Sequence, residues 1–294
     1  MYNQIDSNKR KTWLLIIIFT LLISGLGWFL SYSFNDAGIF VSAIIISIFM
    51  SLFGYFAGDK VALATAGAKQ IKESDNQEVY HLVENLCITA GLQMPKIYLI
   101  DDQAINAFAT GRDPKHASIA ITTGAIARLE NEELEGVIAH ELSHVKNYDI
   151  RLMMIVIILV GVTTLIADFF WRSRFFGGSR SDNDNKGNLG AILAIVGIIL
   201  IILSPIIAEL IKLAISRKRE YLADASGALL TRYPAGLANA LEKIKNDSTQ
   251  MSHANNATAH LYIANPFKKA GFMSNAFSTH PPIDDRIKKL REMA

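Results

Sequence analysis

Long apolar blocks constrain the fold of this chain more than any other feature of its sequence. Four blocks are almost free of charged residues: Trp13 to Leu30, Gly38 to Ala57, Leu152 to Phe170 and Leu189 to Ala208. Each has about the ~20 residues that a helix needs to cross ~30 Å of hydrocarbon. Buried helices of a large soluble core are the alternative, but so many blocks leave too little polar chain to cover them. The sequence therefore predicts four transmembrane helices.

The distribution of basic residues orients these helices. Residues 9–11, Lys-Arg-Lys, precede the first block, whereas residues 31–37, between the first two blocks, contain no Lys or Arg. Because basic residues stay on the cytoplasmic side, we expect both termini and residues 59–151 to be cytoplasmic. Residues 172–188 fit less well, because this expected outer loop carries four basic residues and only two acidic ones.

Other features narrow the compartment and the partners. The first block is longer than the apolar region of a signal peptide and a second block follows it directly, so we expect it to be retained. The single cysteine, Cys87, excludes an intramolecular disulfide and fits a reducing compartment. The net charge of +2 argues against a nucleic-acid partner. We expect a protein of the inner or plasma membrane, in contact with the lipid bilayer.

Residues 140–144 read His-Glu-Leu-Ser-His, the H-E-x-x-H pattern. On a helix, His140 and His144 share one face, with Cβ atoms about 5–6 Å apart. Such a pair can bind one zinc ion, and Glu141 can act as the general base that takes a proton from water. Asn131 is the expected N-cap of this helix, and three glutamates follow it within four residues. The alternative is a solvated helix with two ordinary histidines.

A pair of acids follows the fourth apolar block. Glu220 and Asp224 are four residues apart, on a helix that we expect to continue from the membrane. A catalytic zinc needs a third protein ligand and one open position, and Glu220 can supply that ligand. Asp224 can orient a ligating imidazole through its other nitrogen. The alternative is a helix surface that balances residues 217–219, and Glu209, at the apolar end of the fourth block, is a rival ligand.

The remaining polar chain mixes helices and short strands. We expect helices over 76–90, ended by Gly91, and over 234–245, and strands over 97–100, 106–111 and 117–122. A last helix, opened by residues 280–282, His-Pro-Pro, holds Arg286. We do not expect His81, His253 or His260 to be metal ligands.

The H-E-x-x-H helix is expected close to the membrane. No Gly or Pro separates it from Leu152, where the third apolar block begins. The site should therefore lie within a few helical turns of the inner surface. Strongly polar residues flank the motif on both sides, at 131–135 and 146–151, so an intramembrane protease is excluded.

Together these features predict an α-helical multi-pass membrane protein with a cytoplasmic, zincin-like α+β catalytic domain. Its four transmembrane helices form two hairpins. The expected parts are an N-terminal transmembrane hairpin, the first half of the metalloprotease domain, a second transmembrane hairpin and the second half of the domain: residues 1–58, 59–151, 152–213 and 214–294.

H-E-x-x-H, E-x-x-x-D after the last block and His-Pro-Pro near the end make the chain similar to the HtpX family of bacterial membrane metalloproteases, relatives of the CAAX prenyl endopeptidases. The resemblance implies one zinc ion per chain, bound by His140, His144 and Glu220 as in gluzincins, with Glu141 as the base. It also implies that His280 steadies the oxyanion and that Asp224 supports the metal site. The substrate would be held as an added β-strand along Asn106, Ala107, Phe108, Ala109, Thr110 and Gly111, with Arg286 as a supporting residue on the substrate side.

The function implied by the resemblance is quality control and stress response: cleavage of misfolded or damaged membrane proteins on the cytoplasmic side. Two alternatives stay open. One is a dedicated processing protease for a defined membrane or prenylated substrate, and the other is a non-catalytic membrane scaffold. The sequence also leaves open a homo-oligomer or a larger membrane protease complex.

Overall fold

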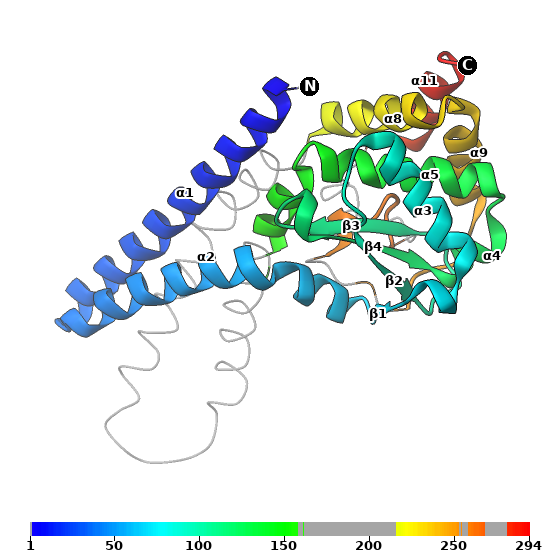
Figure 1. The fold of residues 1–294 in the computed structure, drawn as a ribbon. Coiled ribbons are helices and arrows are strands. Elements are labelled where there is room, and N and C mark those ends of the chain that lie inside the picture. Colours follow the sequence, from blue (N-terminus) through cyan, green and yellow to red (C-terminus); the bar gives the residue numbers. More distant parts are fainter. Residues whose placement is uncertain (1, 158–160, 162–215, 253, 255–257, 268–280) are drawn as a thin grey trace.

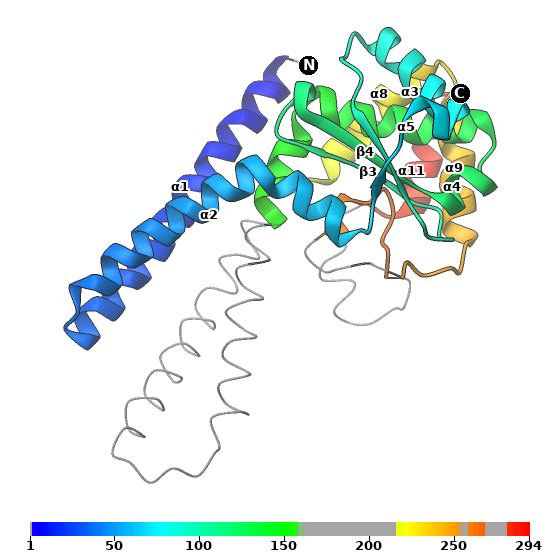
Figure 2. The same ribbon diagram turned by 60° about the horizontal axis from the view of Figure 1, so that its bottom comes forward.

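A computed structural model describes residues 2–157, 161, 216–252, 254, 258–267 and 281–294. Within these ranges the chain forms a long helical hairpin and an α+β body (Figure 1). The hairpin consists of α1 (Tyr2–Phe34) and α2 (Ala37–Thr65), which lie side by side in opposite directions. Figure 2 shows that the start of α1 and the end of α2 lie at the end of the hairpin nearer the sheet.

Both hairpin helices have the length and composition of membrane spans. The apolar segments Gln4–Phe34 and Ala37–Thr65 are long enough to cross a bilayer, and most of their surface is not covered by protein. Large apolar side chains such as Leu21 and Phe49 are 66% and 65% exposed. Such exposure is typical of helices that contact lipid rather than a protein core. The first two predicted helices are therefore present, and α2 continues past the predicted boundary at residue 58. Of the third and fourth predicted helices, only residues 152–157 and 161 are described, and they are helical.

The sheet of the body has four strands, in the order β1-β2-β4-β3. Strands β2 and β4 are parallel, and the other pairs are antiparallel. The strands are β1 (Lys69–Gln70), β2 (Lys96–Ile100), β3 (Ala107–Gly111) and β4 (Ala117–Thr122). The three predicted strands are thus confirmed to within one residue at each end, and β3 lies at an edge of the sheet.

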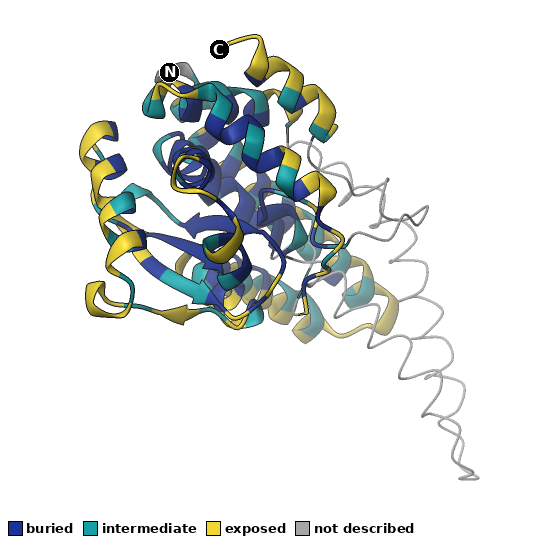
Figure 3. Cartoon of the chain, turned by 90° about the vertical axis from the view of Figure 1, so that its right-hand side faces the viewer, coloured by how far each residue is buried: buried dark blue, intermediate teal, exposed yellow. Residues whose placement is uncertain are grey.

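Side chains from alternate strand positions pack into two separate cores. Along β4, Ile119 and Ile121 face a core shared with α3 (Gln77–Ala90), α5 (Asn131–Lys146), α9 (Pro234–Asn246) and α11 (Ile283–Arg291). Ala120, between them, faces a core formed with the end of α2 and with Leu261 and Tyr262. Both faces of the sheet are therefore covered, and Figure 3 shows the buried residues gathered at the centre of the body.

The predicted start of one helix agrees with the structure, and that of another does not. Helix α3 begins after Asn76, whose side chain accepts the Val79 N–H, and ends at Gly91 in the left-handed conformation, as predicted. In contrast, Asn131 is not the N-cap of α5. Glu130 takes that position, because the Glu133 carboxylate accepts the Glu130 N–H at 2.9 Å.

The sequence predicted that helix α5 runs without interruption into the third apolar block. This prediction is wrong. The helix ends at Lys146, and Tyr148 adopts a left-handed backbone with φ 59° before helical structure resumes at Asp149. This conformation costs a residue other than glycine about 1–3 kcal/mol. Two cations lie on the Tyr148 ring, Lys9 Nζ at 4.5 Å and Arg151 Cζ at 5.0 Å from its centre.

A second predicted continuity is also absent. Helix α8 (Arg217–Thr231) begins at Arg217, after an extended Ser216, rather than continuing from the fourth apolar block. The described part of the body also contains the short helix α4 (Thr123–Arg128) and 3-10 turns at Glu73–Asp75, Pro114–His116 and Ala259–Leu261.

Candidate metal centre

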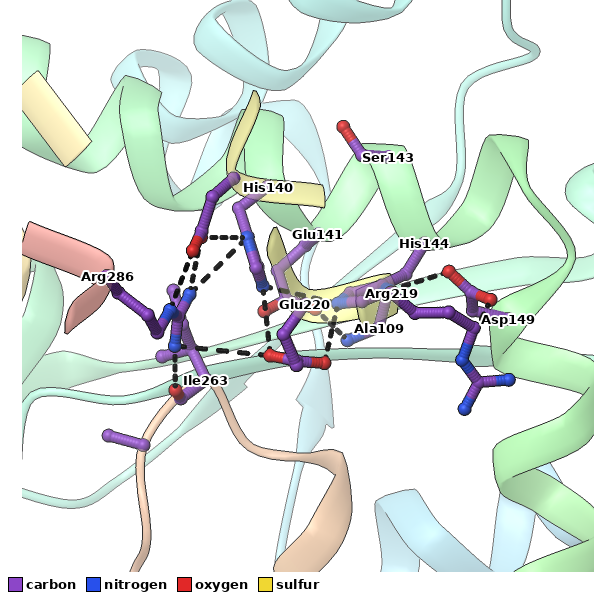
Figure 4. A network of polar contacts seen from close by, with 12 residues as sticks. Ala109, His140, Glu141, Ser143, His144, Asp149, Arg219, Glu220, Ile263 and Arg286 are labelled. Carbon is purple, nitrogen blue, oxygen red and sulfur yellow. Dashed lines mark hydrogen bonds and ion pairs between the residues drawn. The ribbon is translucent and has the colours of Figure 1, made fainter. Parts of the chain in front are cut away.

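Three helices bring the predicted site residues together inside the body. Helix α5 supplies the two motif histidines and Glu141, α8 supplies Glu220 and Asp224, and α11 supplies Arg286 (Figure 4). Gly227 allows α8 to approach α5, because a Cβ at this position would lie 3.0 Å from the His140 nitrogen. All the charged groups of the site are buried, with 4% or less of each residue exposed.

The side chains of His140, His144 and Glu220 converge at the spacing of a metal site. Their nearest ligand atoms all lie within 4.8 Å of one another. The two histidine Nε2 atoms are 3.2 Å apart, and the Glu220 oxygens lie 3.5 Å from His144 Nε2 and 3.9 Å from His140 Nε2. Ligands about 2.1 Å from a tetrahedral ion lie about 3.4 Å apart, so the described geometry fits a small divalent cation.

The His140 ring is oriented by a carboxylate and a guanidinium from two other helices, Asp224 on α8 and Arg286 on α11. Its Nδ1 lies 3.0 Å from Asp224 Oδ1, so its Nε2 is free to face the other ligands. Arg286 donates to both oxygens of Asp224, at 2.9 and 2.7 Å, and also to the Ile263 carbonyl. Burial alone would raise the pKa of Asp224, but Arg286 and His140 lower it to about 2.

The His144 ring is oriented from a different direction. Its Nδ1 lies 3.0 Å from Asp149 Oδ2, just after the break in the helix. The other oxygen of Asp149 accepts a hydrogen bond from Asn8 Nδ2 at 2.7 Å, and Arg219 Nε lies 3.5 Å from it. Asn8 also donates to the Asn147 carbonyl at 2.9 Å. The first helix of the chain is therefore connected to His144 through Asp149.

The two histidines have opposite electrostatic surroundings. Burial, with the nearby positive Arg286, lowers the pKa of His140 to about 4 despite Asp224. Burial alone would also lower the pKa of His144, but Asp149 and the neighbouring carboxylates raise it to about 9. The negative potential that favours a proton on His144 also favours a divalent cation at the same atoms.

Glu141 lies beside the three converging side chains and on the side of β3. Its Oε2 accepts the Ala109 N–H at 2.8 Å. Burial, together with the negative Glu220, raises the pKa of Glu141 to about 8, while His144 opposes the shift. The site thus combines a candidate cation site with an acid whose pKa lies near neutrality.

Comparisons with known proteins agree with this geometry. Residues 73–294 match the profile of Peptidase family M48. The chain belongs to this family. A protease HtpX homolog from Caldanaerobacter subterraneus subsp. tengcongensis is 45% identical over 297 residues, covering 100% of this chain and 98% of that protein. A protease HtpX homolog from Streptococcus gordonii is 40% identical over all of both chains.

A solved structure supports the fold. The crystal structure of S. mikatae Ste24p matches with a TM-score of 0.51 at 19% identity, covering 99% of this chain and 67% of that one. This similarity concerns the fold alone. Membership of family M48 makes the chain a metalloprotease, which argues against the scaffold alternative, and its two exposed apolar helices fit a membrane protein.

Within this M48 metalloprotease, the predicted substrate strand is partly occupied by the chain itself. The Ala107 carbonyl accepts the Ile263 N–H at 3.0 Å, so residue 263 lies along the start of the β3 edge. The Asn106 side chain bonds the Ala264 carbonyl and holds the same segment in place, and Phe108 packs on Tyr262 in the second core. The strand continues from Ala109, whose N–H is donated to Glu141, through Thr110 to Gly111.

The other predicted residues have varied positions. Arg286 is buried against Asp224 and the His140 ring, so it supports the histidine rather than lining a substrate surface. His81 is exposed beside Glu84, the His260 ring is buried against the Met153 carbonyl, and neither is one of the three converging side chains. The expected oxyanion residue, the rival ligand and one further histidine lie outside the described residues: His280, Glu209 and His253.

Sequence reasoning missed three residues of this M48 site: Asn8, Asp149 and Arg219. Asp149 was noted only as part of the polar flank of the motif. The signal that could have identified it is its position five residues after His144, within reach of that ring only if the helix breaks between them. No local signal marks Asn8, because its contact with Asp149 joins residues 141 positions apart.

Asn8 gives a first testable prediction. Replacing it with alanine removes the donor that holds Asp149 and the Asn147 carbonyl, so the His144 ring should be less well fixed. The partners of ligating histidines are typically worth 10–100-fold in metal affinity. Because Asn8 is more distant, we expect Asn8→Ala to lose about tenfold in metal affinity and to release its metal correspondingly faster. The measurement is the rate at which a chelator removes the metal from the purified full chain, and Asp6→Asn, an exposed change on the same helical turn, is the control. An unchanged rate in Asn8→Ala would show that Asn8 does not position the site.

Proposed function

We propose that this metalloprotease is a zinc-dependent endopeptidase of the inner or plasma membrane, which cleaves misfolded or damaged membrane proteins on the cytoplasmic side. One observation carries the proposal: two buried imidazoles and one buried carboxylate converge at ligand spacing next to a further acid, Glu141. Three protein ligands of this kind, with a position left for substrate, are typical of catalytic zinc. In this proposal His140, His144 and Glu220 bind the ion.

The mechanism assigns separate tasks to the residues around the site. When bound, zinc would polarise the substrate carbonyl and make a water molecule more acidic. Glu141, which lies beside the three proposed ligands, takes the proton of that water and later gives it to the leaving nitrogen. Because water supplies the attacking oxygen, no residue of the chain becomes covalently attached to the substrate. His280 is proposed, from the family resemblance alone, to steady the oxyanion.

Substrate alignment would come from the edge of β3. An extended peptide that pairs with this edge would replace Glu141 as the acceptor of the Ala109 N–H, and it would thereby place one of its carbonyls beside that carboxylate. Main-chain pairing of this kind reads the backbone rather than the side chains. It therefore supports cleavage of many unfolded segments rather than of one defined sequence.

The cytoplasmic placement of the catalytic body is supported by basic residues at the end of the hairpin nearer the sheet. Residues 9–11 are Lys-Arg-Lys at the start of α1. At the end of α2, Arg151 and Arg112 lie over the rings of Tyr55 and Phe56, at 5.6 and 5.4 Å. Basic residues gathered at one end of paired spans favour the cytoplasmic side for that end, and the catalytic body lies there.

Topology is testable by thiol labelling. In a Cys87→Ser background, single cysteines at Ser31 and at position 185, Asn in this chain, should react with an impermeant reagent added outside the cell, and one at Met293 should not. If native Cys87 were retained, it would react only slowly with the reagent, because burial raises the pKa of its thiol to about 11. Labelling at position 185 only after the cells are opened would contradict a second transmembrane hairpin.

The proposed activity is tested with the purified full chain and its metal. We expect cleavage of a denatured membrane protein at several sites and slow cleavage of the same protein when folded, because only extended segments can pair with β3. The products are mapped by mass spectrometry, and a prenylated peptide serves as the comparison substrate. Cleavage of that peptide at one site, with no cleavage of denatured membrane proteins, would favour the dedicated processing enzyme instead.

A further inference from the structure

A basic pocket lies between the start of α1 and the start of α8. Its volume is about 440 Å³. Two of its lining residues are exposed or half-buried lysines, Lys11 on α1 and Lys218 on α8. Polar groups surround them on both helices: Gln4, Ser7, Ser216 and Arg219. None of the described lining residues is acidic.

Arg219 is the unusual member of this lining. Only 5% of the residue is exposed, and among the described residues its Nε and Nη1 have no hydrogen-bond partner. Asp149 and Glu220 balance its charge from the side of the metal site, with Asp149 Oδ1 3.5 Å from Nε. Buried N–H groups without an acceptor are costly, and a guanidinium is well suited to bind phosphate oxygens.

The first turn of α8 adds a second source of positive potential. This helix has 15 residues, and its N-cap residue Ser216 makes no capping hydrogen bond with its side chain. The amide groups at such an end favour an anion, and phosphate groups bind there often. Lys11, Lys218, Arg219 and this helix end therefore all favour an anionic ligand, while Glu220, the acid in the first turn of α8, belongs to the metal site.

We propose that this pocket binds the phosphate group of an anionic phospholipid in the leaflet next to the catalytic body. The proposal rests on the membrane placement of α1 given above. Lys11 lies two residues before Trp13, where the first apolar block begins, so the pocket is at the depth of the lipid headgroups. Basic pockets beside transmembrane helices on the cytoplasmic side are typical sites for such headgroups. Free phosphate offers the same chemistry but is not concentrated at that surface.

The neighbouring residues provide a matched test. Arg10 and Arg217 are exposed, precede Lys11 and Lys218 directly on the same two helices, and do not line the pocket. The double variants Lys11→Gln/Lys218→Gln and Arg10→Gln/Arg217→Gln therefore lose the same charge at the same depth. Full-length protein is reconstituted in phosphatidylcholine vesicles, and the binding of spin-labelled phosphatidylglycerol is compared with that of spin-labelled phosphatidylcholine.

We expect the wild type to retain phosphatidylglycerol selectively. At about 1 kcal/mol for each basic residue, the lysine pair should weaken this selectivity about 30-fold, while the arginine pair should change it little. Equal losses in both variants would show a general surface charge and overturn the pocket. Displacement of the labelled lipid by millimolar inorganic phosphate would assign the site to free phosphate and overturn the lipid. No selective binding in the wild type would overturn both.

The readout keeps this proposal separate from the proposed function. Lipid binding is measured without a substrate, and neither variant changes a residue of the metal site. A protein that binds the lipid but does not cleave membrane proteins would support the pocket and contradict the protease function. A protein that cleaves membrane proteins without lipid selectivity would support the protease function and contradict the pocket.

Discussion

Replacing Glu141 with glutamine is expected to abolish nearly all cleavage while the metal stays bound. The amide keeps the size of the side chain and can still contact the Ala109 N–H through its oxygen, but it cannot take a proton from water. A general base typically contributes 10²–10⁴-fold, so the rate should fall by at least about a hundredfold. The measurements are the initial rate of cleavage of a denatured membrane protein and the metal content of the purified chain.

Glu132→Gln is the control for this change, because Glu132 is an exposed glutamate on the same helix. It should cleave like the wild type. A Glu141→Gln protein that keeps more than about a hundredth of the normal rate would show that another group serves as the base. Loss of metal in Glu141→Gln would show that this side chain belongs to the ligands.

The second large effect is expected at Glu220. The Glu220→Ala chain should purify without metal and without activity, because only two of the three converging ligands remain. Asp224→Asn should keep part of its metal, since a group that orients a ligating imidazole is typically worth about 10–100-fold in affinity or activity. Asparagine is preferred to alanine here because Arg286 would otherwise lose both of its bonds to residue 224. Metal content by elemental analysis separates the two roles.

Two results would contradict this assignment. Full metal stoichiometry in Glu220→Ala would exclude Glu220 as a ligand. Loss of metal in Glu209→Ala, with normal metal in Glu220→Ala, would identify the rival acid instead. Circular dichroism of each variant distinguishes a lost ligand from a lost fold.

The candidate ligands could be found from sequence because each depends on a simple rule. His140 and His144 follow from helical spacing, which places them on one face of α5. Glu220 follows from the chemistry of zinc, which requires one more protein ligand, and from the paired spacing with Asp224. The packing that brings these helices together was not predictable in the same way, since it depends on Gly227 lying directly against the backbone of His140.

The break after α5 shows why the rest of the site could not be predicted. A tyrosine in the left-handed conformation is disfavoured locally, so sequence rules extend the helix through Tyr148. The structure accepts this cost because Asp149 then reaches His144, while Lys9 and Arg151 pack on the tyrosine ring. These contacts join α1 to a turn that is remote in sequence, and no periodic pattern records them.

The positions of Asn8 and Arg286 have a consequence for the synthesis of the enzyme. One residue lies on the first helix and the other on α11, and each holds an acid that orients a different histidine. Residue 286 must therefore be synthesised and must have left the ribosome before both histidines can be fixed. Until then the growing chain carries its motif without both histidines held in place, so the metal centre is completed only after the rest of the fold has formed.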